Sequence, residues 1–226
     1  MSLTREQLAA RVARDIPEGA YVNLGIGAPT LISDYLPEAS EIVLHTENGM
    51  LGMGPQPQAG LVDLDLINAG KLPVTELPGA SYFDQAESFG MMRGGHIDVC
   101  VLGAFQVSER GDLANWSTGA PDAIPAVGGA MDLAVGAKQV FVMTDLFTKN
   151  GVSKLVAECS YPLTGVGCVA RVYTDRAVFD VTPKGFAVAE TFGITVDELR
   201  RLTGLSLIDQ TIPLNTTNRS PEEALS

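Results

Sequence analysis

A single carboxylate stands at the end of an apolar run in the segment EIVLHTENGMLGMGP, residues 41–55. Residues 41–45 have the apolar pattern of a strand, and Glu47 follows beside the pair Asn48 and Gly49. The glycines here strip bulk from the backbone, so a large group could reach the carboxylate. An ionised carboxylate can attack an activated carbonyl without the help of a base. Glu47 is therefore a candidate nucleophile, and the alternative is a solvent-facing glutamate in a turn.

Two more glycine motifs could present backbone N–H groups to a ligand. In GIGAPT, Gly25 and Gly27 lie between a predicted strand and a predicted helix, where backbone amides can approach an anion. In GGAMDL, Gly128 and Gly129 open a predicted helix and could donate to an oxyanion. The first motif lacks the third glycine of a dinucleotide-binding loop and the lysine of a P-loop. For each motif the alternative is a plain tight turn.

The composition excludes several classes of function. The chain has 226 residues and a net charge of −12, which makes nucleic acid a poor partner. An anionic ligand is therefore expected to be held by backbone N–H groups or by charges from another chain. Three scattered cysteines and two histidines predict neither a metal site nor a redox pair. With no long apolar run and no signal-peptide pattern, we expect a cytoplasmic protein that does not enter a membrane.

The elements that must position these residues can be read from periodicity and capping. Strands are predicted over 21–27, 41–45, 97–104 and 139–145, and the last two are typical of buried parallel strands. Helices are predicted after Thr4, over 29–36, within 128–138 and after Thr195, where Thr4 and Thr195 both open capping boxes. The last third is rich in strands, over 166–174, 177–182 and 185–192.

This order of elements predicts an α/β fold with an open, mixed, largely parallel sheet, flanked by helices and ending in a β-rich C-terminal third. We expect one domain over residues 1–213 and a polar, mobile tail over 214–226. Open α/β sheets bind ligands at the carboxyl ends of their strands. The strand ends near 27, 47, 104 and 145 are therefore the expected ligand face.

Seven segments together resemble the B subunits of the two-subunit 3-oxoacid CoA-transferases, and the resemblance extends to about residue 212. The segments are HTENGMLGMGP (45–55), DLINAGK (65–71), LPGASYFD (77–84), RGGHIDVCVLGAFQVS (93–108), GDLANW (111–116), GGAMDL (128–133) and YPLTGVGCV (161–169). The stretch WSTGAPDAIPAVGGAMDL most resembles the 3-oxoadipate (β-ketoadipate) branch. The fold implied is that of the CoA-transferases and the phosphosugar isomerases.

The resemblance implies that Glu47 attacks succinyl-CoA and carries coenzyme A as a glutamyl thioester until a 3-oxoacid takes it. Coenzyme A thioester is then the substrate, and no permanently bound cofactor is expected. A main-chain amide near Gly128 would donate to the oxyanion, and the loop around Gly25 and Gly27 would shape the cavity. Gly129, Asn48 and Gly49 are expected to join them in binding the oxyanion or coenzyme A. The resemblance also implies a partner, the A subunit of such enzymes, in a heterodimer or heterotetramer.

Three positions depart from the family's pattern. Thr46 stands where serine is usual, Ala28 where a larger apolar residue is usual, and Leu146 where a histidine is usual. Acetoacetate therefore stays open as an alternative acceptor. Two further readings are a non-catalytic partner that keeps the fold and a phosphosugar isomerase. The isomerase needs clustered basic phosphate contacts, whereas Lys71, Arg93 and Lys138 are scattered along the chain.

Overall fold

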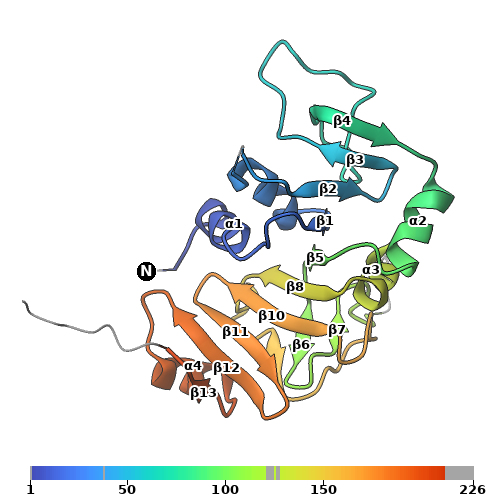
Figure 1. The fold of residues 1–226 in the computed structure, drawn as a ribbon. Coiled ribbons are helices and arrows are strands. Elements are labelled where there is room, and N and C mark those ends of the chain that lie inside the picture. Colours follow the sequence, from blue (N-terminus) through green and yellow to red (C-terminus); the bar gives the residue numbers. More distant parts are fainter. Residues whose placement is uncertain (1, 38, 121–124, 126–127, 212–226) are drawn as a thin grey trace, which may run out of the picture.

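The fold is built on one large sheet whose centre is parallel and which mostly antiparallel strands extend on both sides (Figure 1). A computed structural model describes residues 2–37, 39–120, 125 and 128–211. Within these residues ten strands form the sheet. In spatial order they are β13 (Ile208–Asp209), β12 (Gly185–Thr191), β11 (Ala177–Thr182), β10 (Val169–Thr174), β8 (Gln139–Thr144), β5 (Val99–Leu102), β1 (Tyr21–Leu24), β2 (Val43–Thr46), β3 (Met50–Met53) and β4 (Glu76–Tyr82).

The five central strands are all parallel, from β10 through β8, β5 and β1 to β2. Antiparallel pairs extend the sheet on both sides, with β11 and β12 beyond β10, and β3 and β4 beyond β2. The predicted mixed, largely parallel sheet and the β-rich last third are thereby confirmed. The carboxyl ends of β1, β2, β5 and β8 meet at one edge of the sheet.

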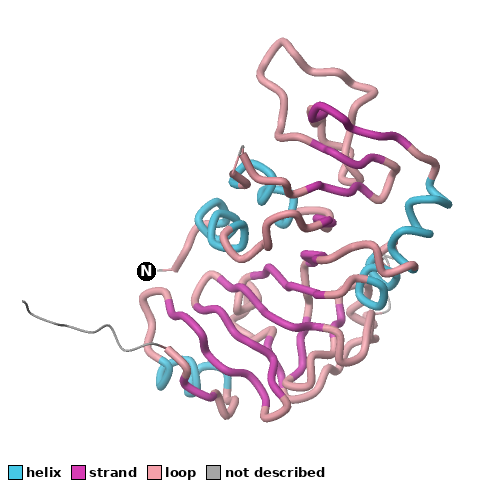
Figure 2. The backbone as a smooth tube through the Cα atoms, in the orientation of Figure 1, coloured by secondary structure: helices cyan, strands magenta, loops and turns pink. Residues whose placement is uncertain are grey.

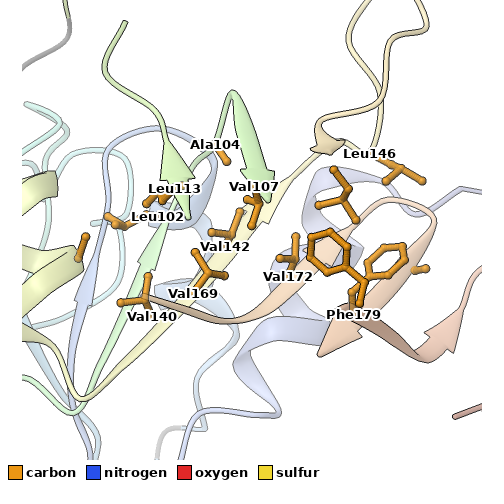
Figure 3. Packing of buried hydrophobic residues seen from close by; sticks show 14 of the residues in the cluster. Leu102, Ala104, Val107, Leu113, Val140, Val142, Leu146, Val169, Val172 and Phe179 are labelled. Carbon is orange, nitrogen blue, oxygen red and sulfur yellow. The ribbon is translucent and has the colours of Figure 1, made fainter. Parts of the chain in front are cut away.

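The two faces of the sheet bury separate apolar cores. Along β5, Cys100 and Leu102 point into one core, and Val99 and Val101 point into the other. This alternation is the period of two that a strand imposes on its side chains. Figure 3 shows the first core, in which Val142, Val172 and other buried residues pack together. Because both faces are covered, the central strands read in the sequence as continuous apolar runs.

Helices cover the two faces (Figure 2). Both predicted capping boxes are present. One face carries α1 (Arg5–Ala13) and η1 (Ala28–Tyr35), and the other carries α2 (Gln85–Arg93), α3 (Ala130–Gly136) and α4 (Val196–Thr203). The element η1 is a 3-10 helix and not the α-helix expected over 29–36. The side chains of Thr30 and Ser33 donate to backbone carbonyls three residues earlier, and such bonds compete with a regular helix.

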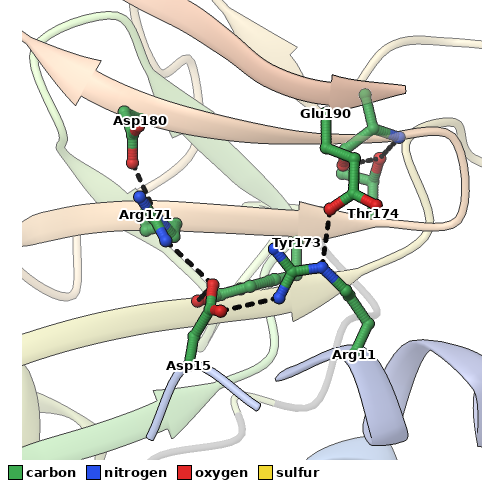
Figure 4. A network of polar contacts seen from close by, with 8 residues as sticks. Arg11, Asp15, Arg171, Tyr173, Thr174, Asp180 and Glu190 are labelled. Carbon is green, nitrogen blue, oxygen red and sulfur yellow. Dashed lines mark hydrogen bonds and ion pairs between the residues drawn. The ribbon is translucent and has the colours of Figure 1, made fainter. Parts of the chain in front are cut away.

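A polar network fastens α1 to the C-terminal strands (Figure 4). Asp15, just after α1, accepts hydrogen bonds from Arg11, from Arg171 on β10 and from the Tyr173 hydroxyl, each at 2.8 Å. Arg11 also pairs with Glu190 on β12 at 2.6 Å. The network fixes the C-terminal end of α1 against β10 and β12.

Sequence patterns missed three features. One is β4 with the α2 helix that follows it, and another is β3, which begins directly after the Asn48-Gly49 pair. The third is a separate sheet, in the described part of the chain, of β7 (Leu113–Ala114), β6 (Gln106–Ser108) and β9 (Leu155–Val156). The predicted polar tail over 214–226 lies outside the described residues.

Candidate active site

Glu47 is the second residue of the tight turn 46–49 that joins β2 to β3. Thr46 and Met50 are paired across this turn, and Gly49 N donates to Thr46 O at 3.1 Å. The Thr46 hydroxyl accepts from Met50 N at 3.1 Å, so the threonine at this position keeps a hydroxyl in the turn. Glu47 is half-buried, and its neighbour Asn48 is exposed. The strand therefore delivers the carboxylate to the sheet edge on a short, hydrogen-bonded hairpin and not on a free loop.

Only glycine fits at position 49 of this turn. Gly49 has a φ of 118°, and a Cβ built there would lie 2.1 Å from Phe83 O. Phe83 N in turn donates to Gly49 O at 3.1 Å. The glycine beside the acid thus lets the segment after β4 close against the hairpin, which holds the backbone on both sides of Glu47.

The Glu47 side chain lies directly against the backbone of Gly129, which precedes α3. A Cβ added to Gly129 would be 2.6 Å from Glu47 Oε2 and 2.8 Å from its Cδ. Any other residue at 129 would displace the carboxylate. Two glycine motifs that are 82 positions apart in the sequence (129 minus 47) are therefore in contact.

These residues share one cavity of about 600 Å³. The cavity lies at the carboxyl edge of the central strands, and the ends of β1, β2, β5 and β8 reach it, through Gly25, Glu47, Ala104 and Asp145. The strand ends predicted to form the ligand face therefore meet at one cavity. Gly128 and Gly129 also line it. Among the described lining residues, Gly27, Asn48 and Gly49 are absent, and the Asn48 amide donates instead to Ile67 O at 2.9 Å.

A buried chain of polar side chains supports the hairpin from below. Asn23 Nδ2, on β1, donates to His45 Nδ1 at 2.9 Å, and His45 Nε2 lies 3.1 Å from the Ser88 hydroxyl on α2. With Nδ1 accepting, the proton is on Nε2 and donates to Ser88, which donates to Thr46 O at 3.5 Å. Burial lowers the pKa of His45 to about 4, so the ring is neutral at physiological pH.

Sequence reasoning missed the cations of this cavity. Lys154 lies just before β9, and Arg5 opens α1; both line the cavity with Thr144 and Asp145 at the end of β8. Lys154 Nζ donates to Thr144 Oγ1 at 2.7 Å. Neither cation stands in a recognisable motif, and each comes from a segment far from Glu47 in sequence. No sequence signal brings them together, because their proximity depends on how the chain packs around the sheet.

Comparison with known proteins identifies the family. The family model described as "Coenzyme A transferase" matches residues 5–197. The chain belongs to the coenzyme A transferase family. It is 62% identical over 210 residues to an Acinetobacter baylyi protein named as the B subunit of 3-oxoadipate CoA-transferase, covering 92% of this chain and 97% of that one. A Pseudomonas putida protein of the same name is 64% identical over 207 residues, with 91% and 97% covered.

The same comparisons reach the 3-ketoacid branch and solved structures. A Helicobacter pylori protein, named as the B subunit of succinyl-CoA:3-ketoacid coenzyme A transferase, is 48% identical, covering 88% of this chain and 96% of that one. The acyl-CoA transferase YdiF of Escherichia coli O157:H7 has the same fold, with a TM-score of 0.70 at 20% identity over 92% of this chain. The chain spans 43% of the length of that solved protein.

These findings confirm the resemblance drawn from the sequence and the expectation that the chain is part of a CoA-transferase. No helix in the described ranges is long and apolar enough to cross a membrane. Of the departures from the family pattern, Ala28 lines the cavity and therefore affects its shape. Leu146 is fully buried in the first core, so the residue that replaces the usual histidine packs beneath the sheet edge.

Proposed function

We propose that this chain is the B subunit of a two-subunit CoA-transferase that moves coenzyme A from succinyl-CoA to a 3-oxoacid, and that the acceptor is 3-oxoadipate. The observation that carries the proposal is the Glu47 carboxylate, held against Gly129 in a cavity at the sheet edge. Relatives with more than 60% identity bear the name of the 3-oxoadipate enzyme.

In the proposed reaction, a Glu47 oxygen attacks the thioester carbonyl of succinyl-CoA. The C–S bond breaks, which gives a mixed anhydride and coenzyme A thiolate. The thiolate attacks the glutamyl carbonyl and releases succinate, so that coenzyme A is held as a glutamyl thioester. The acceptor carboxylate then attacks this thioester, and the two steps run in reverse to give 3-oxoadipyl-CoA and free Glu47.

The geometry supports covalent chemistry at Glu47 in two ways. The hairpin and the Asn23–His45–Ser88 chain fix the backbone that carries the nucleophile, so little freedom is lost when the acyl group binds. The glycine backbone beside the carboxylate leaves space for a tetrahedral intermediate, and we assign the N–H groups at Gly128 and Gly129 as its donors. Reaction through Glu47 requires no resident cofactor.

The rest of the site is expected from a partner chain. The relatives are named as B subunits, and we propose that an A subunit completes the cavity and contacts much of coenzyme A. An enclosed cavity keeps water from the thioester, which would otherwise be hydrolysed. We further propose that the assembly acts in the cytoplasm.

The test is to trap the thioester. The complex with its A subunit is incubated with succinyl-CoA, treated with borohydride, and digested for peptide mass spectrometry. We expect modification at Glu47 in the wild type and none in Glu47→Ala. The matched control is Glu41→Ala, which removes an exposed acid from the same segment and should remain modified at Glu47. An unmodified wild-type peptide would exclude the proposed chemistry.

Acetoacetate is the second candidate acceptor, because the Helicobacter pylori relative is named for a 3-ketoacid. The two acceptors are separated by single-turnover rates of the coenzyme-A-loaded complex with each acid. A faster reaction with acetoacetate would make acetoacetate the acceptor and leave the role of Glu47 unchanged.

A further inference from the structure

The cavity contains a cation that the proposed chemistry does not use. Lys154 is half-buried, and its Nζ makes a hydrogen bond of 2.7 Å to the neutral hydroxyl of Thr144. That hydroxyl is itself committed, since it donates to Ala104 O at 3.3 Å. An ammonium group has three N–H donors. No carboxylate of the described residues forms an ion pair with Lys154.

The surroundings of Lys154 leave the cavity with an excess of positive charge at this end. Arg5 and Lys154 line the cavity, whereas Asp145 is the acid beside them. Asp175, the other nearby acid, already accepts from Leu146 N and pairs with Arg176 at 3.2 Å. Burial lowers the pKa of Lys154; the charge of Asp145 opposes this shift, and Arg5 adds to it more weakly than Asp145 opposes it. A half-buried cation that has no carboxylate in direct contact is costly, and a bound anion reduces that cost.

The position of Lys154 relative to Glu47 suits a short acyl group that carries a charge at its far end. Glu47 follows β2, and Lys154 is anchored on Thr144, the last residue of β8. In the sheet, β1 and β5 lie between these strands. Neighbouring strands are about 4.8 Å apart, so the two backbones are about 14 Å apart. Both side chains line the same cavity from these ends, which leaves room between them for a short acyl chain.

We propose that Lys154, with Arg5 beside it, binds the distal carboxylate of a dicarboxylic acyl group whose other carboxyl carbon reacts at Glu47. This inference rests on the proposed function and names its substrate class. Succinyl-CoA and 3-oxoadipate both have a second carboxylate, and acetoacetate does not. The site therefore favours dicarboxylic acids, although the chain as a whole carries a net charge of −12. From composition alone, an anionic ligand was expected to be held by backbone N–H groups or by charges from another chain.

The test compares donors that differ only in the distal group. Succinyl-CoA and butyryl-CoA have acyl chains of equal length, and butyryl-CoA lacks the second carboxylate. Thioester formation at Glu47 is measured for the complex with the A subunit, as kcat/KM for each donor. In Lys154→Met we expect kcat/KM for succinyl-CoA to fall about 10- to 100-fold, which corresponds to the loss of a charge-assisted hydrogen bond. The value for butyryl-CoA should change less than about 3-fold.

Two further variants make the result specific. Lys154→Arg should recover most of the preference for succinyl-CoA, because the positive charge is kept. Lys149→Met removes an exposed lysine of the same segment, outside the cavity, and should behave as wild type. The dissociation constant of free coenzyme A is measured on each variant and should not change.

Three outcomes would overturn the inference. One is an equal fall for both donors or weaker binding of free coenzyme A, which would make Lys154 a contact of the coenzyme. Another is an unchanged value for succinyl-CoA in Lys154→Met. The third is loss of the preference in Lys149→Met as well. Failure of the wild type to form any thioester would instead refute the proposed function, so the two failures are distinguishable.

Discussion

In two regions of the described chain, the network at α1 and the cavity, half-buried cations are neutralised differently. In the network that fastens α1 to the sheet, Arg11 and Arg171 share Asp15, and each has a further acid, Glu190 or Asp180 (Figure 4). In the cavity, Lys154 has a hydroxyl as its partner. The network is complete within one chain, whereas the cavity has charge left for something else to neutralise.

The difference separates residues that stabilise the fold from residues that prepare a site. A charge that is paired on every side contributes to folding and offers nothing to a ligand. A charge that is desolvated without a counterion weakens folding and strengthens binding, as is usual for functional sites. Changes in the network should therefore alter stability, and changes in the cavity should alter rate.

The largest effect is expected from Gly129→Ala in the cavity. Its new methyl group would overlap the Glu47 carboxylate, with 2.6 Å to Oε2, and displace the nucleophile. Misplacement by about 1 Å can cost about 100-fold, so thioester formation should slow by about this factor while the free energy of unfolding stays similar. Gly90→Ala is the control, because a Cβ there meets no described atom within 4 Å. Equal rates in the two variants would contradict the placement of Glu47.

In the network, Asp15→Asn should lower stability and leave the rate nearly unchanged, which is the reverse of the result expected for Gly129→Ala. It removes the charge shared by Arg11 and Arg171, and we expect a loss of about 2 kcal/mol in the free energy of unfolding, with little change in the rate of thioester formation. Urea titration measures the first quantity. Asp197→Asn breaks an exposed pair with Arg200 and should cost less than about 0.5 kcal/mol. Similar losses in the two variants would show that the network is no more than a surface pair.

Acid should weaken the support beneath Glu47 before it affects the network. The pKa of His45 is lowered from 6.5 to about 4 by burial, so between these values the unfolded chain binds more protons than the folded chain. Stability should fall by about 2 kcal/mol as the pH is lowered from about 6 to about 4.5. The pKa of Asp15 is held below its usual range by Arg11 and Tyr173, against the opposing effect of burial, so the network survives this window.

Denaturant midpoints measured across these pH values check the prediction. His45→Gln should lose this dependence of stability on pH, and His96→Gln, which changes an exposed histidine, should keep it. A slope that persists in His45→Gln would assign the effect to another group.

The smallest effect is expected from Lys154→Met on stability. Removal of a cation that lacks a carboxylate relieves its desolvation, so the free energy of unfolding should change by less than about 1 kcal/mol or rise slightly. Thermal melting of Lys154→Met and of Asp15→Asn under the same conditions measures this directly. A loss as large as that of Asp15→Asn would mean that Lys154 is a structural cation after all.

Local signals in the sequence predicted much of the fold. The central strands were found because each is buried on both faces and reads as an apolar run, and the capping boxes at Thr4 and Thr195 mark helix starts correctly. By contrast, η1 deviates because local side-chain hydrogen bonds compete with the helix. Strand β4 was missed because most of its residues are exposed at the sheet edge, which leaves no apolar pattern to recognise.

The candidate site, too, has residues that local signals predicted and residues that they did not. Glu47, Gly25 and Gly129 were found because glycines beside a strand end leave a mark in the sequence. Arg5 and Lys154 could not be found, since an isolated basic residue at a helix start or before a short strand has no distinctive spacing. Tertiary packing alone brings them to the cavity.

The buried Asn23–His45–Ser88 chain has a consequence for engineering. It joins β1, β2 and α2, three pieces of backbone that are distant in sequence. A designer who grafts the four-residue turn 46–49 onto a foreign scaffold would transfer the acid but none of the scaffolding that aims it. In this protein the smallest transplantable unit of reactivity is a sheet corner with its underlying helix.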